Sequence, residues 1–178
     1  MPTIQDMLHQ CGGMVYATTL DMIMSYYAMN VREDMRKYLG IILPWGKYVY
    51  NKMPMGFKIS ADVFQRELSL LFQNMPYVLV YIDDILVITK ESFEQHLQAV
   101  EKVLAILQEA GMQLNIDKSF FAKDEVDYLG YVISRSGIKP QASKMQIIVD
   151  MPRPKTVKQV KRFAGMINFY RDLRQLWN

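Results

Sequence analysis

The chain has 178 residues, of which 51% are hydrophobic and 22% are charged. This length and composition exclude an intrinsically disordered protein and fit one globular domain, or one domain with an appendage. No uninterrupted apolar run reaches the length of a membrane-spanning helix, because Asp83 and Asp84 interrupt the longest one. We therefore expect no membrane partner.

The cysteine content and the start of the chain point to an intracellular setting. The single cysteine, Cys11, cannot form a disulfide within the chain. The first residues, MPTIQDMLHQ, lack the apolar core of a signal peptide. We expect an intracellular, reducing compartment.

The net charge of +3 is unevenly distributed along the chain. Residues 139–178 contain nine Lys and Arg and two Asp, a net charge of +7, so residues 1–138 carry −4. An acidic body followed by a basic arm is typical of a protein that binds a polyanion. A basic helix that faces only water is the alternative interpretation.

Apolar periodicity, capping residues and turn residues predict an alternation of short strands and amphipathic helices. In chain order we expect a helix over 2–10, a strand over 15–21, strands over 40–43 and 47–50, a helix over 60–75, a hairpin over 77–89, a helix over 93–110, a strand over 112–121, two short strands within 126–138 and a helix after 156.

Three of the expected helices have recognisable caps, at Ser60, at Ser92 with Gln95, and at Thr156 with Gln159. Their predicted buried faces are Phe64, Leu68, Leu71, Phe72 and Met75 in the first; Phe93, Leu97, Val100, Leu104 and Leu107 in the second; and Val157, Val160, Phe163 and Ile167 in the last. A surface or structural role for His96 is favoured over a catalytic one, because no second His or Cys is near it.

The hairpin over 77–89 carries two adjacent carboxylates, Asp83 and Asp84, at its tip between two apolar runs. Both faces of its strands are apolar, as expected of central strands covered on both sides. Like charges about 4 Å apart repel by roughly 4 kcal/mol at an effective dielectric constant near 20. One carboxylate must therefore bind a cation or take up a proton, and oxygen ligands suit magnesium. Asp is also a common turn residue, so a structural role is the alternative.

A third carboxylate, Asp21, lies at the end of the strand predicted over 15–21. Side chains from separate segments converge where strands end beside a sheet. We therefore expect Asp21 to be a partner of the acid pair.

Taken in order, these motifs resemble those of the reverse transcriptases of retroviruses and of Gypsy-type long-terminal-repeat retrotransposons. The signals are LD followed by an aromatic residue, MPxG before FQR, YIDD, LNxxKxxF, YLGxxIS with GI, and then PxPxT and FxGxxNxYR. They run over nearly the whole chain in the family's order. The ordered set is far more specific than any one of its members.

The resemblance implies an α+β fold, the right-hand polymerase palm, with helices packed on one face of an antiparallel sheet and the start of a helical thumb or connection. The palm would occupy residues 1–137, with the fingers largely missing, and a truncated basic thumb or connection segment would occupy 138–178. In such a palm Asp21, Asp83 and Asp84 hold two Mg²⁺ ions, for which Mn²⁺ can substitute. One ion activates the primer 3'-hydroxyl, and the other neutralises charge on the triphosphate.

The family motifs also imply roles for other residues. Lys118 matches a lysine near the triphosphate that can donate a proton to pyrophosphate. Tyr26 matches the aromatic ring that excludes a ribose 2'-hydroxyl, with a core tyrosine as the alternative. Met55 and Gly56 belong to the nucleotide pocket. Leu129, Gly130 and Tyr131 match the primer grip, and the basic residues expected to bind nucleic acid are Lys155, Lys158, Lys161 and Arg162.

Two segments depart from the family pattern. Where the family usually reads SGYHQ, this chain has MSYYA over residues 24–28, so a glycine is lost beside the carboxylates. Met55 stands for the usual Phe, and residues 59–62 replace an Asn-Ala-Pro-Ala run. The second segment shapes the pocket for the nucleotide and the template.

The resemblance implies an RNA-directed DNA polymerase, a nucleotidyltransferase fragment of a retroelement Pol polyprotein. Its expected partners are a primed RNA or DNA template, deoxynucleoside triphosphates, and the rest of the polyprotein, including fingers and ribonuclease H. One alternative is an inactive remnant that binds nucleic acid or only packs with other chains. Another is a different palm-type nucleotidyl transferase such as a cyclase, which the thumb-like tail argues against.

Overall fold

The computed structural model describes residues 2–171. Its helices are α1 (Ile4–Gln10), α2 (Glu33–Arg36), α3 (Ser60–Leu71), α4 (Phe93–Glu109), α5 (Ala142–Val149) and α6 (Val157–Arg171), with a 3-10 turn η1 (Ser25–Ala28). Its strands are β1 (Tyr16–Ile23), β2 (Gly40–Leu43), β3 (Gly46–Val49), β4 (Val78–Tyr81), β5 (Asp84–Thr89), β6 (Gln113–Lys123), β7 (Glu125–Tyr128), β8 (Tyr131–Ser134) and β9 (Gly137–Pro140). The predicted α+β class is confirmed.

Every predicted strand and helix is present, and four elements were not predicted. These are η1, α2, β9 and α5. The helix predicted over 60–75 ends as α3 at Leu71, four residues earlier than expected. The predicted domain boundary after residue 137 falls inside β9, and the division into domains stays a prediction.

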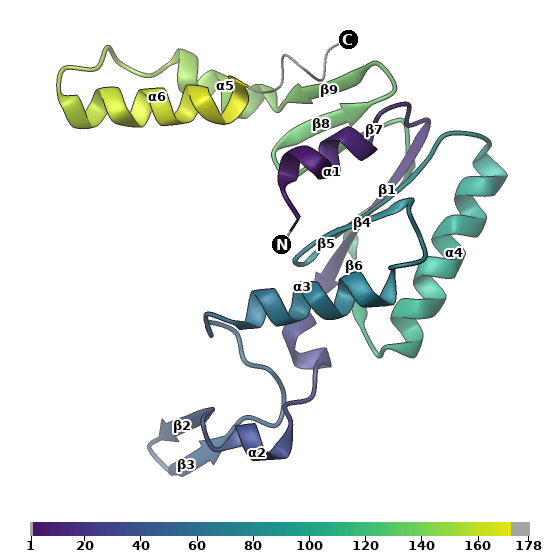
Figure 1. The fold of residues 1–178 in the computed structure, drawn as a ribbon, viewed down its shortest axis with the longest axis vertical. Coiled ribbons are helices and arrows are strands. Elements are labelled where there is room, and N and C mark those ends of the chain that lie inside the picture. The colour runs from purple at the N-terminus through teal and green to yellow at the C-terminus, as the bar shows by residue number, and fades with distance from the viewer. Residues whose placement is uncertain (1, 172–178) are drawn as a thin grey trace.

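All strands pair antiparallel, in three sheets. The central sheet has the order β4-β5-β1-β6, while β2–β3 and β7-β8-β9 form two smaller sheets. In Figure 1, β2, β3 and α2 project from one end of the central sheet and the α5–α6 pair projects at the other end. The elements at both ends thus lie outside the central sheet, which carries the core.

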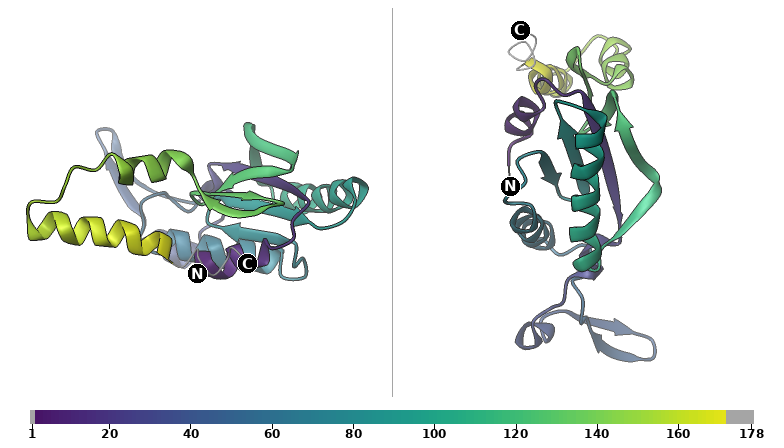
Figure 2. Two further views of the ribbon diagram at one scale, coloured as in Figure 1. Left: turned by 90° about the horizontal axis from the view of Figure 1, so that it is seen from above. Right: turned by 90° about the vertical axis from the view of Figure 1, so that its right-hand side faces the viewer.

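The central sheet separates two apolar cores, as the two-faced hairpin pattern predicts. Ile85 and Val87 of β5 face a core shared with α3 and α4, and Leu86 and Ile88 face a core shared with α1 and the β7–β9 sheet. These four side chains are at most 4% exposed. Figure 2 shows α4 running along the strands on its side. Full burial of each such side chain stabilises the fold by about 1.5–3 kcal/mol, so the register of β5 is strongly fixed.

One polar residue of α3, Gln65, reaches across the core to the β4–β5 turn. It is 4% exposed, its Nε2 donates to the carbonyl oxygen of Val80 at 2.9 Å, and its Oε1 accepts from the amide of Ile82 at 2.7 Å. Ile82 has φ 53°, a left-handed conformation that is unfavourable for a β-branched residue. The two hydrogen bonds from Gln65 therefore stabilise a strained turn.

The predicted cap at Ser60 was wrong. Ile59 occupies the N-cap position without a side-chain hydrogen bond, and Ser60 is already helical. The Ser60 hydroxyl instead donates to the carbonyl oxygen of Pro54 at 3.1 Å, so it stabilises the loop that precedes α3. Leu71 was expected in the buried stripe but is 39% exposed, because α3 ends there.

Helix α4 has its predicted N-cap and a different buried face. Ser92 Oγ accepts from the amide of Gln95 at 3.2 Å, which confirms the cap. Phe93 and Leu97, predicted to be buried, are 43% and 49% exposed. The helix is rotated because a histidine faces the sheet in their place; the buried side chains are His96, Ala99, Val100, Val103 and Leu107.

His96 is a structural histidine, as expected. It is fully buried, with Nε2 2.8 Å from Thr18 Oγ1 and Nδ1 2.9 Å from Thr89 Oγ1. Burial lowers the pKa of His96 from its usual 6.5. Both ring nitrogens are thereby satisfied in a dry environment that disfavours the charged imidazolium.

Helix α6 is capped as predicted, but the α5–α6 pair covers little apolar surface. Gln159 donates its amide to Thr156 Oγ1 at 3.3 Å, and Gln159 Oε1 accepts from the amide of Thr156 at 3.1 Å. Val157 and Val160, predicted to pack, are 74% and 53% exposed. That prediction was wrong because α6 lies beside α5, which has no buried residue, and not on the sheet.

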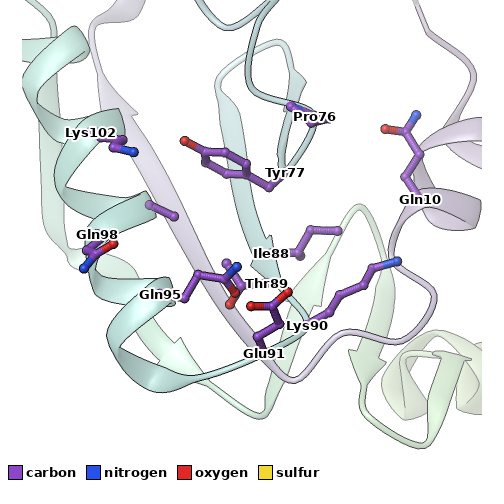
Figure 3. Close-up of a pocket in the computed structure, with 11 residues that line it drawn as sticks. Gln10, Pro76, Tyr77, Ile88, Thr89, Lys90, Glu91, Gln95, Gln98 and Lys102 are labelled. Carbon is purple, nitrogen blue, oxygen red and sulfur yellow. The ribbon is translucent and has the colours of Figure 1, made fainter.

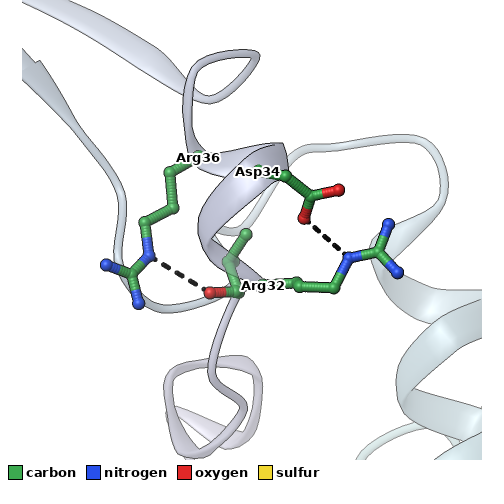
Figure 4. A network of polar contacts seen from close by, with 4 residues as sticks. Arg32, Asp34 and Arg36 are labelled. Carbon is green, nitrogen blue, oxygen red and sulfur yellow. Dashed lines mark hydrogen bonds and ion pairs between the residues drawn. The ribbon is translucent and has the colours of Figure 1, made fainter.

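Local polar contacts hold the short helix α2 at the projecting end (Figure 4). Arg32 Nε lies 2.7 Å from Asp34 Oδ1, and Arg36 Nε donates to the carbonyl oxygen of Val31 at 3.2 Å. Arg32 and Asp34 are exposed, so their ion pair contributes about 1 kcal/mol at most.

Within residues 2–171, no helix combines the length and the apolar character that a membrane crossing requires.

Replacing His96 with Gln should remove a pH-dependent part of the stability. Because burial lowers the pKa of His96, the unfolded chain binds more protons than the folded chain as the pH falls below about 6.5, and the wild type loses stability there. His96→Gln should therefore lose less free energy of unfolding between pH 7 and pH 5, measured by denaturant titration. The control is His9→Gln, at an exposed position. An equal loss in His96→Gln and the wild type would contradict the prediction.

Replacing Gln65 with Leu should destabilise the fold by about 2 kcal/mol or more. The change leaves the Val80 carbonyl and the Ile82 amide without their partner, at about 1–3 kcal/mol for each buried unsatisfied group. Thermal and denaturant unfolding would measure the loss. Gln98→Leu, at an exposed site on α4, is the matched control and should change stability little. Equal stability of the two variants would show that Gln65 does not support the turn.

Candidate active site

The register between β1 and β5 places Asp21 directly opposite Asp84. Both residues line a cavity of about 110 Å³, which Lys118 from β6 and Leu129 from the β7–β8 turn also line. Three of the predicted catalytic residues and one predicted primer-grip residue thus share one cavity. They come from four separate segments of the chain.

The carboxylates interact electrostatically. The pKa of Asp84 is raised, mainly by burial and then by the negative charges of Asp21 and Asp83. The protein therefore leaves part of the repulsion at this site uncompensated, and a bound cation would relieve it.

Asp83 lies in the two-residue turn between β4 and β5, and Asp84 is already the first residue of β5. The prediction that both acids lie at the tip of the hairpin is therefore correct for Asp83 alone. The hydroxyl of Ser25 donates to Asp83 Oδ1 at 2.5 Å. Asp83 is not among the residues that line the cavity with Asp21 and Asp84.

The donor set fits a divalent cation by its chemistry, although the carboxylates are not gathered into a closed ligand group. Within the described part of the chain, no three His, Cys, Asp or Glu side chains are arranged to hold a metal ion. Asp21 and Asp84 supply hard oxygen ligands, and magnesium sites often use only one or two carboxylates. The buried hydroxyl of Tyr128, which also lines the cavity, has no hydrogen-bond partner among the described residues. The cavity thus has room and unused polar groups for an ion with its waters.

Strand β6 positions the other side of the cavity. Ser119 Oγ accepts from the amide of Asp21 at 3.1 Å and donates to the carbonyl oxygen of Asn115 at 2.7 Å. The pairing of β1 with β6 shifts register between Thr19 and Asp21, and Ser119 fills that irregularity. The bulge brings Lys118 to the cavity that the carboxylates line.

Tyr26 lies in η1, close to the acid turn. Its ring packs against the ring of Phe64 with centroids 5.1 Å apart, and the side chain is only partly buried. Burial, and then the charge of Asp83, raises the pKa of the Tyr26 hydroxyl. The ring is therefore anchored on the core and only partly covered, and its predicted contact with a sugar stays a prediction.

The other two residues predicted to bind the nucleotide, Met55 and Gly56, lie in the loop before α3. Met55 is 54% exposed, and Gly56 has φ +87° with open space around it. Neither lines the carboxylate cavity. The structure thus leaves the pocket segment on the surface before α3.

The predicted primer grip is a two-residue turn between β7 and β8. Leu129 and Gly130 both have positive φ, 50° and 88°, which favours glycine at the second position. Tyr131 is 4% exposed and belongs to the core, so a contact with a primer would fall on the turn backbone and not on this side chain.

The basic residues of the arm are exposed on or next to α6. They are Lys155, Lys158, Lys161 and Arg162. Lys161 and Arg162 line a cavity of about 490 Å³ with Lys144 of α5. Lys144 also covers the β7–β8 turn, because a Cβ built on Gly130 would lie 2.4 Å from Lys144 Nζ. A positive side chain therefore connects the turn to the arm.

A larger cavity, of about 660 Å³, lies between α4 and the far ends of β4 and β5 (Figure 3). Its lining includes Tyr77, Lys90, Gln95 and Lys102. None of the predicted site residues lines it. Cavity size alone would therefore point away from the residues that the family motifs single out.

Sequence reasoning missed three residues that support the site: Ser25, Gln65 and Lys144. Ser25 stood in the sequence as a departure from the family pattern, and Gln65 as part of FQR. Their partners, Asp83 and Ile82, are 58 and 17 residues away along the chain, so no local pattern could reveal them.

Comparison with known proteins identifies the family. The family described as "Reverse transcriptase (RNA-dependent DNA polymerase)" matches residues 1–133. The chain is 35% identical over 177 residues to the "Retrovirus-related Pol polyprotein from transposon opus" of Drosophila melanogaster, covering 98% of this chain and 18% of that protein. The corresponding polyprotein of transposon gypsy is 30% identical over 173 residues, covering 96% and 17%. The chain thus spans about a fifth of the length of these relatives.

Solved structures give the same result. A foamy viral protease-reverse transcriptase in complex with double-stranded DNA has a TM-score of 0.81 at 29% identity, covering 89% of this chain and 28% of that one. The foamy viral enzyme in complex with an RNA/DNA hybrid has a TM-score of 0.76 at 29% identity, covering 88% and 21%. The predicted polymerase fold is confirmed, and the chain belongs to the reverse transcriptase family.

Proposed function

We propose that this chain is the palm portion of an RNA-directed DNA polymerase that adds nucleotides to a primer 3'-hydroxyl. The observation that carries the proposal is the pairing of Asp21 with Asp84 at one cavity, with Asp83 in the adjoining turn. Two Mg²⁺ or Mn²⁺ ions held at these carboxylates would activate the attacking hydroxyl and neutralise the triphosphate. The substrates would be a primed RNA or DNA template and deoxynucleoside triphosphates. The rest of a Pol polyprotein would supply fingers and ribonuclease H in an intracellular setting.

Other residues of this chain would transfer a proton or position the primer and the nucleotide. Lys118, in the same cavity as the carboxylates, would hold the proton that the leaving pyrophosphate takes up. The Leu129–Gly130 turn would hold the primer end beside Asp84, because Leu129 lines that cavity too. Met55 and Gly56 would approach the nucleotide from the loop before α3. Such positioning can account for about 7–11 kcal/mol of a barrier.

A second candidate is an inactive remnant that binds nucleic acid. Two observations favour it: Asp83 is hydrogen-bonded to Ser25, and no three carboxylates form a ready ligand group in the described part of the chain. Primer extension on a primed RNA template distinguishes the two. Magnesium-dependent extension that Asp84→Asn abolishes would establish the polymerase. Binding of the primed template without any extension would establish the remnant.

The metal proposal predicts that Asp83→Asn weakens binding of Mn²⁺ or Mg²⁺ by at least about tenfold. Loss of one negative charge removes more than 1.4 kcal/mol of attraction at the effective dielectric of a partly exposed site. Isothermal titration calorimetry of the wild type and the variant would measure it. Asp124→Asn, at an exposed position outside the cavity, is the control. Equal affinity in all three proteins would contradict the proposal.

The proposed role of Tyr26 predicts that Tyr26→Val admits ribonucleotides. Removing the ring opens space where a 2'-hydroxyl would lie, so discrimination against ribonucleotides in primer extension should fall by at least about tenfold, or 1.36 kcal/mol. Tyr27→Val, one position along η1, is the matched control. If Tyr26→Val discriminated as strongly as the wild type, Tyr26 would have only its packing role against Phe64.

The net positive charge of the basic arm, residues 139–178, predicts that affinity for duplex DNA falls as salt concentration rises. Each phosphate contact contributes about 0.9 to the slope of log affinity against log salt. Replacing Lys158, Lys161 and Arg162 with Gln should therefore flatten the slope by about 2–3. The control removes three exposed charges elsewhere, with Lys90, Lys102 and Lys123 changed to Gln. Fluorescence anisotropy with a labelled duplex would measure both slopes, and equal slopes would mean that the arm faces only solvent.

A further inference from the structure

The hydroxyl of Ser25 and the carboxylate of Asp83 form a hydrogen bond beside the candidate active site. The donor–acceptor distance is 2.5 Å, at the short end of the range that a hydroxyl donating to a carboxylate normally shows. Ser25 is 3% exposed, so water competes little for its hydroxyl. A charge-assisted bond in such a dry place is stronger than one on the surface.

The backbone holds the Ser25 donor in a fixed position. Ser25 opens η1 directly after Met24, which has φ 46°, and the amide of Tyr27 donates to the Met24 carbonyl oxygen at 2.9 Å. The next side chain, Tyr26, is anchored on Phe64. These contacts hold the backbone that carries Ser25, so the hydroxyl can follow Asp83 only by rotation of its own side chain.

Asp83 is engaged by Ser25 while Asp21 and Asp84 face the shared cavity. A carboxylate that joins them around a cation must offer oxygen lone pairs in that direction, and Ser25 now occupies a lone pair of Oδ1. Asp83 directly precedes Asp84 in the chain, in the turn that joins β4 to β5.

We infer that Ser25 is a positioning residue that competes with a divalent cation for the carboxylate of Asp83. The inference rests on the proposed function, since it takes Asp83 as a metal ligand. Cation binding would exchange the Ser25 hydrogen bond for coordination, and loss of the hydroxyl would make binding tighter. A serine that only stabilised the turn would change the stability of the fold and leave the metal affinity unchanged.

The test is a double-mutant cycle read by calorimetric titration with Mn²⁺. Ser25→Ala should bind Mn²⁺ about tenfold more tightly than the wild type, which corresponds to about 1.4 kcal/mol. In the Asp83→Asn background the same substitution should leave the affinity unchanged, because its effect passes through Asp83. Ser25→Thr, which keeps a hydroxyl, should restore affinity close to that of the wild type.

A matched control separates competition from general loosening of the fold. Ser60→Ala also removes a buried hydroxyl, 3% exposed and bonded to the Pro54 carbonyl oxygen, and should lower stability without changing the Mn²⁺ affinity. Unchanged or weaker binding by Ser25→Ala, in a chain whose Mn²⁺ binding Asp83→Asn weakens, would overturn this inference alone. If Asp83→Asn had no effect on Mn²⁺ binding, the proposed metal role and this inference would fail together.

Discussion

The antiparallel register of β1 and β5 is the constraint on which the site depends. It pairs Tyr16 with Thr89 at one end and Asp21 with Asp84 at the other. A slip of one residue would move Ile85 and Val87 from one core to the other and would part the two acids. Because these strands are buried on both faces, the apolar side chains fix the register, and the register fixes the carboxylates.

The pairing of Asp21 with Asp84 brings negative charges together, and the protein only partly offsets their repulsion. The pKa of Asp84 is raised by burial and by its two acidic neighbours. The backbone around the acids is held by polar side chains from other elements: Gln65 from α3 holds the β4–β5 turn, and Ser119 from β6 holds the amide of Asp21. The protein thus stabilises the positions of the carboxylates through neutral donors and acceptors and keeps their negative charge available.

Sequence reasoning succeeded where a local pattern determines the structure. The two-faced hairpin and the Ser92 and Thr156 caps depend on neighbours within a few residues or on simple alternation. It failed where a distant segment decides. The buried face of α4 is set by Thr18 and Thr89 on the sheet, which bind His96 and turn Leu97 outward. Val157 was expected to pack, but it is exposed on α6, which lies beside α5, a helix without a buried residue.

The candidate site shows the same limit. Motif order located Asp21, Asp84, Lys118 and Leu129, and the structure gathers these four at one cavity. It could not show that Asp83 has a separate partner, because Ser25 lies 58 residues away and meets it only when β1 and the hairpin pair. Nor could it show that Tyr131 belongs to the core while its neighbour Leu129 faces the cavity.

Three contacts among η1, α3 and the β4–β5 turn connect Asp83 to the ring of Tyr26. Phe64 supports the Tyr26 ring, and the next residue of α3, Gln65, holds the turn that contains Asp83. The third contact is the hydrogen bond from Ser25 of η1 to Asp83. Phe64 and Gln65 are adjacent on helix α3, so one helix supports both the Tyr26 ring and the turn that contains Asp83. The carboxylate and the ring are therefore positioned by the same short segment, so the place of a cation and the place of a sugar would depend on each other.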